Sequence, residues 1–128
     1  ENVISLVVDY THRINKYVNC EWLIIDNDEK FLNNLKDDDY FVLLDERGIE
    51  INNLEFSKRL EQIYNSGKKR VVFLIGGAYG VNKNIKSRAD FIMSFSKLVF
   101  PHMLMRIMLS EQLYRVHTIM KGEKYHHQ

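Results

Sequence analysis

The 128-residue sequence has one cysteine, one proline and no long apolar run. Because Cys20 stands alone, an internal disulfide is excluded, and no ligand partners near it indicate a metal site; its ordinary role is that of a small buried residue. The longest apolar runs, such as 71–75, fall far short of the roughly 20 residues that cross a bilayer, and no n-region and h-region open the chain. We therefore expect a soluble, cytoplasmic protein with no membrane and no metal partner.

The usual nucleotide-binding fingerprints are also missing. Residues 76–80 have the pattern G-G-x-x-G rather than G-x-G-x-x-G, and no Lys-Ser or Lys-Thr pair completes a phosphate-binding loop, which argues against NAD and ATP. With 45% hydrophobic residues, the chain is long enough for one ordinary core but not for two. We expect a single domain over residues 1–128, without internal repeats.

The net charge of +1 conceals an uneven distribution. Residues 1–64 carry seven lysines and arginines against fourteen acids, whereas residues 65–128 carry eleven against three. This asymmetry is typical of a protein whose one end meets a polyanion, although a solvated surface shows weaker versions of it. The candidates for sequence-independent phosphate contacts are Lys68, Lys69, Arg70, Lys83, Lys86, Arg88, Lys121 and Lys124.

Apolar periodicity predicts helices that alternate with short buried strands. Asn52 or Asn53 can cap a helix, and Gly67 can supply the left-handed residue that ends it. The expected helices cover about 3–17, 26–36, 54–65, 84–90 and 102–121, and the expected strands 22–25, 40–44, 70–75 and 91–95. This alternation favours an α/β fold with a mostly parallel sheet covered by helices on both faces.

Three of the predicted strands end in segments suited to ligand binding. Leu44 closes one strand before an Asp-Glu pair, and Gly76 begins a glycine-rich turn after the next. Residues 95–100 should form a loop, because the residue before Pro101 is pushed toward extended geometry. The carboxyl ends of parallel strands share one sheet edge, where backbone groups can hold a flat, partly apolar ligand such as an adenosine. Simpler interpretations are turn acids and a turn that only redirects the chain.

The final predicted helix is apolar around most of its circumference. The apolar residues leave a polar stripe at Arg106, Ser110, Tyr114, His117 and Lys121. In so small a chain, burial on two sides is explained most simply by a second subunit in a two-fold dimer, but the central helix of a monomer is the alternative. Glu111 and Arg115 are spaced to pair with each other on this helix. By itself the tail, residues 121–128, reads as a frayed end or a tag remnant.

Four signatures stand in one order along the chain: Ile-Gly-Gly at 75–77, Phe-Pro-His at 100–102, Glu-Gln-Leu-Tyr-Arg at 111–115 and Tyr-His-His at 125–127. With them, the stretch from Tyr40 through Gln128 resembles the small SPOUT-class methyltransferases of bacteria, which methylate N3 of a pseudouridine in large-subunit ribosomal RNA. The resemblance implies S-adenosylmethionine as cofactor, 23S rRNA of the assembled ribosome as substrate, and a homodimer whose pocket is completed by the partner's tail.

The resemblance also implies a fold with a deep C-terminal trefoil knot, in which the last segment is threaded through an earlier loop. Threading is otherwise nearly absent from protein folds, so periodicity does not predict it. The positions that match the family's cofactor-binding residues are Leu44, Gly76, Phe95, Ser96, Lys97, Leu98, Val99 and Phe100.

The implied reaction transfers a methyl group from a sulfonium to an imide nitrogen, which attacks only after losing its proton. His126 is the candidate base. Tyr125 is a candidate for stacking on or orienting the target base, and Arg115 for holding the anion or a phosphate, unless Arg115 only forms a structural salt bridge. Alignment of nitrogen, methyl and sulfur alone could supply most of the acceleration.

The chain departs from the family pattern near its start. Family members open with an apolar strand that ends in Gly-Lys, and this sequence begins at the first helix, with Glu1. A lysine-rich loop usual after the 22–25 strand is also missing around Asn27. Either this is a shortened member or segments are absent from the sequence as given. The main rival to the methyltransferase is a non-catalytic RNA- or ribosome-binding dimer that keeps the fold, followed by a flavodoxin-like nucleotide-binding protein.

Overall fold

The structure is a computed structural model, and it describes residues 2–76 and 81–125. The chain forms two compact units. The helical unit comprises Glu1–Trp22, Asn52–Glu61 and Phe100–Gln128, and the sheet unit comprises Leu23–Ile51 and Gln62–Val99. The expectation of a single domain stays a prediction.

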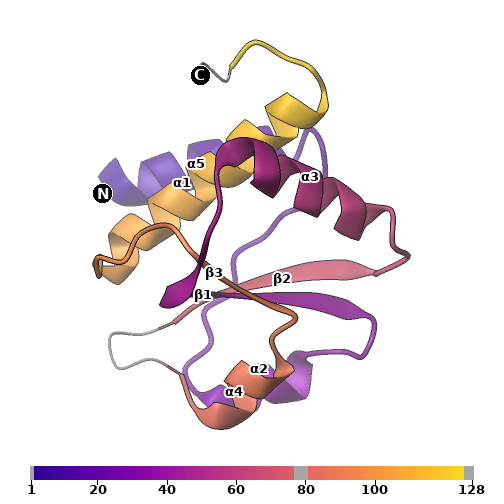
Figure 1. The fold of residues 1–128 in the computed structure, drawn as a ribbon. Coiled ribbons are helices and arrows are strands. Elements are labelled where there is room, and N and C mark those ends of the chain that lie inside the picture. The colour runs from indigo at the N-terminus through magenta and orange to yellow at the C-terminus, as the bar shows by residue number, and fades with distance from the viewer. Residues whose placement is uncertain (1, 77–80, 126–128) are drawn as a thin grey trace. The chain divides into compact units, whose positions relative to one another are not determined.

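The sheet unit is built on three parallel strands, β1 (Asp39–Glu50), β2 (Arg70–Ile75) and β3 (Phe91–Ser94), in the order β2-β1-β3 (Figure 1). The predicted strands over 40–44, 70–75 and 91–95 are thus confirmed. In the central strand, residues 41–44 are all buried, whichever face they point to. A strand buried on both faces reads as a continuous apolar run, which is what the sequence shows there.

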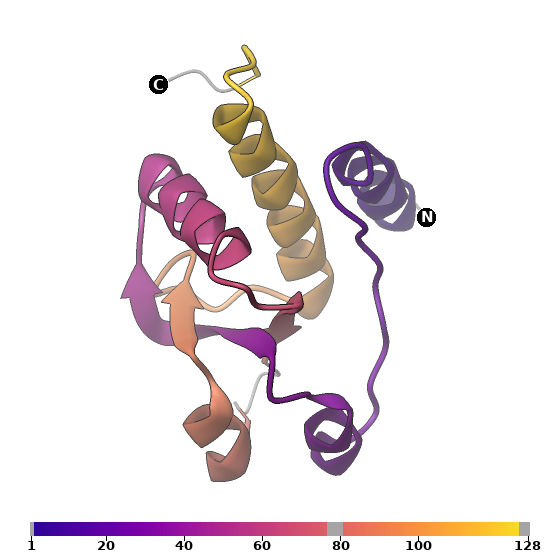
Figure 2. The same ribbon diagram turned by 90° about the vertical axis from the view of Figure 1, so that its right-hand side faces the viewer.

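One face of the sheet is covered by two short helices, α2 (Asp28–Asn34) and α4 (Lys83–Arg88), which lie on the same side of the strands in both views (Figure 1, Figure 2). Asn27 and Asn82 cap them by accepting hydrogen bonds from the backbone amides of the first turn. The core of this layer is a cluster of Phe31, Phe41, Leu43 and Ile85. Phe41 and Leu43 are two residues apart, so they face the same helices.

β1 is longer than predicted, and its ladder is broken where the sequence suggests a turn. Leu44 pairs with Ile75 of β2 and with Met93 of β3, and Ile49 then pairs with Met93 again. Residues 45–48 therefore form a bulge rather than the end of the strand. The Asp45 carboxylate accepts a hydrogen bond from the Arg47 backbone amide at 2.9 Å, so Asp45 has the predicted role of a turn acid.

The predicted strand over 22–25 is wrong. These residues have no regular secondary structure, and Leu23 and Ile24 are 66% and 89% exposed. A strand needs a neighbour to accept its backbone hydrogen bonds, and the described residues offer this segment none. Trp22 is engaged elsewhere, because its indole donates a hydrogen bond to the Thr11 hydroxyl at 3.0 Å and lies against Arg106. Cys20, expected to be buried, is only partly so.

The helical unit contains α1 (Asn2–Ile14), most of α3 (Asn53–Tyr64) and α5 (His102–Met120). The predicted helices in these regions are confirmed, although α1 ends three residues early. Asn52 and Glu55 form a capping box at the start of α3, each side chain accepting from the other's backbone amide at 2.9 Å. Gly67, beyond the end of α3, has the predicted left-handed conformation with φ of 88°.

α1 packs along α5 (Figure 1, Figure 2), and it does so over the stripe that the sequence suggests is polar. Tyr17, just after α1, stacks on His117, with ring centroids 5.7 Å apart. Ser110 and His117 are buried, and each bonds to a carbonyl one turn earlier on α5, at 2.8 and 2.6 Å. The stripe is therefore an interhelical contact and not simply a solvent face.

Candidate functional site

The structure brings the first set of predicted cofactor positions to one edge of the sheet unit. Leu44 pairs with Ile75, the residue before Gly76, and with Met93, two residues before Phe95. Because all three strands are parallel, these positions lie at their carboxyl ends, where open α/β sheets bind ligands. The predicted convergence of three strand-end segments is thus present in the backbone pairing itself.

At Gly76, a side chain would come close to the neighbouring strand. Its amide donates a hydrogen bond to the Leu44 carbonyl at 3.3 Å. A Cβ atom built at Gly76 would lie 3.3 Å from that same carbonyl oxygen and 3.7 Å from Val81 Cγ1. The edge next to Leu44 is therefore tightly filled, and a ligand there would meet backbone rather than a side chain. The rest of the glycine turn, residues 77–80, lies outside the described residues.

Residues 95–100 form the loop that the proline predicts, and hydroxyl groups shape its first part. Ser94 donates a hydrogen bond to the Ser96 carbonyl at 2.6 Å, and the Leu98 amide donates to the Ser96 hydroxyl at 3.0 Å. These bonds hold the backbone while the apolar side chains of Leu98 and Val99 stay 70% and 65% exposed. Exposed apolar side chains on a fixed loop fit a surface that a partly apolar ligand would cover.

The remaining loop positions have distinct surroundings. Lys97 is exposed, whereas Phe95 and Ser96 are partly buried. Phe100 is partly buried and belongs to the helical unit, so it is described with α5 and not with the sheet edge. Of the predicted cofactor set, the sheet unit therefore gathers Leu44, Gly76 and residues 95–99.

The predicted catalytic residues Arg115 and Tyr125 meet in the helical unit around the Glu111 carboxylate. Arg115 donates to Glu111 Oε2 from Nη2 at 2.7 Å and from Nε at 3.1 Å, and the Tyr125 hydroxyl donates to the same oxygen at 2.9 Å. The Arg115 guanidinium also lies 4.8 Å from the Tyr125 ring centre. Arg115 thus forms the predicted i,i+4 salt bridge and also contacts the tail tyrosine, and its role in holding the anion or a phosphate stays a prediction.

The protonation of this cluster follows from its contacts. The hydrogen bonds to Glu111 raise the pKa of the Arg115 guanidinium, which stays a cation. Burial raises the pKa of the Tyr125 hydroxyl well above its usual range, and its hydrogen bond to Glu111 raises that pKa further. Tyr125 is thus a hydrogen-bond donor and not a base at neutral pH. His126, the predicted base, lies outside the described residues.

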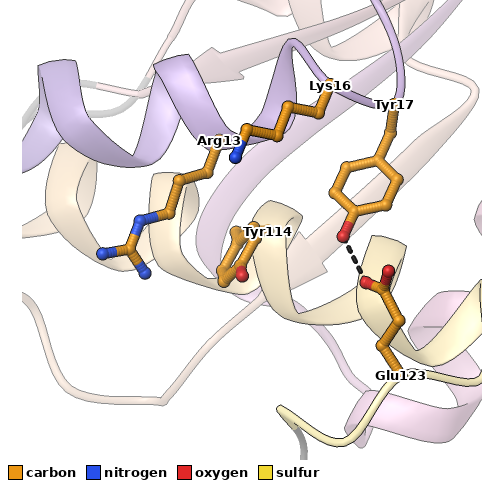
Figure 3. A pocket seen from close by; sticks show the side chains of 5 residues that line it. All are labelled: Arg13, Lys16, Tyr17, Tyr114 and Glu123. Atoms are coloured by element: carbon orange, nitrogen blue, oxygen red, sulfur yellow. Dashed lines mark hydrogen bonds between the residues drawn. The ribbon is translucent and has the colours of Figure 1, made fainter.

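Two surface hollows are lined by residues that do not belong to the predicted cofactor set. One, of about 460 Å³, is in the sheet unit beside the bulge of β1, between Arg47, Lys86 and Phe91 among others. The other, of about 570 Å³, is in the helical unit and is lined by Arg13, Lys16, Tyr17, Tyr114 and Glu123 (Figure 3). Sequence reasoning missed this second group, although a signal exists: Arg13, Lys16 and Tyr17 are three and four residues apart at the end of a helix.

Within residues 2–76 and 81–125, no group of three or more histidine, cysteine or carboxylate side chains could hold a metal ion. The helices of these same ranges are each too short or too polar to cross a membrane.

Comparison with known proteins identifies the family. The model described as "Predicted SPOUT methyltransferase" matches residues 1–126. A Bdellovibrio bacteriovorus protein named ribosomal RNA large subunit methyltransferase H is 46% identical over 77% of this chain and 63% of its own length. Relatives of the same name from Caldicellulosiruptor saccharolyticus and Christiangramia forsetii are 45% and 36% identical, over 88% and 96% of this chain and 72% and 88% of their own lengths. This chain thus spans just under two thirds of the first relative. It belongs to the SPOUT methyltransferase family.

Proposed function

We propose that this protein is an S-adenosylmethionine-dependent methyltransferase that acts, in the cytoplasm, on N3 of a pseudouridine in 23S rRNA of the assembled ribosome. Family membership supports methyl transfer, and the relatives named ribosomal RNA large subunit methyltransferase H support a large-subunit rRNA substrate. The observation that carries the proposal is the meeting of Leu44, Gly76 and the 95–99 loop at the carboxyl edge of one parallel sheet.

The residues of this edge fit the proposed cofactor. Leu44 is buried, Gly76 leaves the backbone bare, and the loop presents the apolar side chains of Leu98 and Val99. Together with Phe95, Ser96, Lys97 and Phe100, they would hold the adenosine portion. When bound, S-adenosylmethionine supplies an electrophilic methyl group on a sulfonium. The proposal includes a C-terminal trefoil knot, helices on both sheet faces and a homodimer whose second tail completes the pocket.

In the proposed reaction the chain's own residues prepare the nucleophile. The pseudouridine N3–H must lose its proton, and a neighbouring cation lowers the free energy of the resulting anion. Arg115 is such a cation, and Glu111 holds it in place with two hydrogen bonds. Tyr125 keeps its proton, so its role is to orient or stack on the target base. His126 is left as the proposed base.

Tritiated methyl transfer to 70S ribosomes tests the activity, and ribosomes that lack the pseudouridine test the acceptor. Wild-type protein should label only the first kind. Label on neither would favour the rival, a non-catalytic RNA- or ribosome-binding dimer, provided that S-adenosylmethionine still binds.

Calorimetry with S-adenosylmethionine tests the proposed cofactor edge. Gly76→Val should abolish binding because its methyl groups would crowd the Leu44 carbonyl, whereas Lys58→Ala, on the exposed surface of α3, should bind like wild type. Wild-type protein that does not bind would favour a nucleotide-binding protein of flavodoxin-like type instead.

The proposed base is tested separately in single-turnover experiments. His126→Ala should lower the single-turnover rate at least about tenfold. This threshold is conservative, because general-base catalysis typically contributes about 100-fold or more. Its affinity for S-adenosylmethionine should stay unchanged. An unaltered rate would remove His126 from the mechanism and leave alignment as the main source of acceleration.

A further inference from the structure

The hollow of the helical unit combines positive charge with aromatic surface. Arg13 and Lys16 extend from α1 and the turn after it, Tyr114 comes from α5, and Tyr17 and Glu123 close one end (Figure 3). Its volume of about 570 Å³ lies in the range of small-ligand sites. None of these five residues belongs to the predicted cofactor or catalytic set.

The two cations of the hollow differ in their interactions with other side chains. Arg13 forms an exposed ion pair with Asp9 at 3.2 Å and lies 5.5 Å from the centre of the Tyr114 ring. Lys16 is exposed, and its backbone amide donates a hydrogen bond to the Arg13 carbonyl at 3.2 Å, but its ammonium group pairs with none of the described residues. In Figure 3 the Lys16 side chain runs toward the stem of Arg13, whereas the Arg13 guanidinium extends away from Lys16. The two charged groups are thus offset along the hollow, and each can contact a phosphate oxygen of a bound nucleotide.

The two tyrosine rings that line the hollow are held in place by contacts with other side chains. Tyr17 stacks on His117 and donates a hydrogen bond to Glu123, which fixes its ring at both ends. Tyr114 packs against Tyr17 at 6.4 Å and against Tyr125 at 4.8 Å, measured between ring centres. Rigid rings lose little entropy when a planar group stacks on them.

We propose that this hollow binds a nucleotide of single-stranded RNA, with its phosphate between Arg13 and Lys16 and its base against the tyrosine rings. Glu123 and Asp9 together carry as many negative charges as Arg13 and Lys16 carry positive ones, so a bare anion is held weakly and a ligand that also stacks is favoured. The inference rests on the proposed function and deepens it. Because Tyr114 touches Tyr125, the bound nucleotide would be a neighbour of the one that is methylated.

Fluorescence anisotropy with a 5′-labelled U12 RNA tests the charge of the hollow. Lys16→Ala should weaken binding about fivefold and lower the slope of log affinity against log salt by about 0.7, the value for one phosphate contact on a single strand. Lys58→Ala is the matched control, since it removes an exposed lysine of the same unit, and should change neither quantity. Both side chains are exposed, so neither variant should unfold the protein.

Photocrosslinking with U12 that contains 5-iodouridine tests the aromatic surface. Mass spectrometry should map the crosslinks of the wild-type protein to Tyr17 or Tyr114, and UMP should compete for U12 at lower concentration than inorganic phosphate does. Equal effects of Lys16→Ala and Lys58→Ala would overturn the inference. So would crosslinks confined to peptides with residues 68–70 or 83–88, or no binding of U12.

The two proposals can fail separately. If U12 crosslinks to Tyr17 or Tyr114 but no methyl group reaches ribosomes, the RNA site stands and the proposed enzyme does not. If ribosomes are methylated while Lys16→Ala binds U12 like wild type, the enzyme stands and the RNA site does not.

Discussion

Gly48 lies in the bulge of β1, at a point where the chain touches the backbone of β3. A Cβ atom at this position would lie 2.7 Å from the Ile92 carbonyl oxygen, 2.8 Å from its carbonyl carbon and 2.9 Å from its Cγ2 atom. Two of these three atoms are backbone, held by the β1–β3 ladder, so the contact cannot be relieved by rotating a side chain. Gly48→Ala should therefore force the bulge away from β3.

The expected cost is that of overpacking a filled site, about 1–3 kcal/mol of unfolding free energy. Gly76→Ala is the matched comparison, because the nearest atom to its Cβ among the described residues, apart from its chain neighbours, is 3.3 Å away. A shift of a few tenths of an ångström relieves that contact, and the loss of chain entropy in the unfolded state partly offsets it. Gly76→Ala should stay within about 1 kcal/mol of wild type.

Urea unfolding followed by far-UV circular dichroism measures both costs, provided that the slopes of the three transitions agree. Amide hydrogen exchange in β1 and β3 assigns the loss to the sheet unit. The reasoning is refuted if Gly48→Ala is as stable as wild type, or if Gly76→Ala is the less stable of the two variants.

Two further predictions concern ion pairs. Arg70 holds the pKa of the buried Asp39 carboxyl below its usual value. The pair therefore stabilises the fold at pH values above the pKa of an unfolded aspartate, about 4, and this stabilisation is lost as the pH falls through the lowered pKa. In urea unfolding at each pH, Arg70→Gln should lower the unfolding free energy by about 1–3 kcal/mol at pH 7 and by less in acid. Glu111→Ala removes the acceptor that Arg115 and Tyr125 share. In the same assay it should lower the unfolding free energy by about 1–3 kcal/mol, whereas Tyr125→Phe should lower it by about 1 kcal/mol.

The sheet and its helix caps could be predicted because their causes are local. Residues 41–44 and 71–75 are short, unbroken apolar runs, which suit strands buried on both faces. Asn52 and Gly67 have side-chain and backbone chemistry that favours the two ends of a helix, whatever the helix packs against. The meeting of Leu44 and Gly76 at one edge then follows from parallel pairing alone.

The features that could not be predicted depend on partners distant in the sequence. Ser110 and His117 read as a polar face of α5, but both are buried, Tyr17 stacks on His117, and both bond to carbonyls of their own helix. Burial also lowers the pKa of His117, which keeps the ring neutral in this contact. Periodicity reveals where a stripe lies on a helix, but not which neighbour packs on it.

The predicted strand over 22–25 shows the same dependence, because an apolar run becomes a strand only beside another strand. Among the described residues, no strand pairs with Ile24, and its side chain is 89% exposed, whereas Ile85 in the sheet core is fully buried. Ile24→Thr should therefore change the unfolding free energy by less than about 0.5 kcal/mol. The identical substitution Ile85→Thr should cost about 2–4 kcal/mol, from a cavity and a buried hydroxyl. If urea unfolding gave Ile24→Thr a cost above 1 kcal/mol, roughly twice the usual limit for a surface site, this segment would have to be packed in solution.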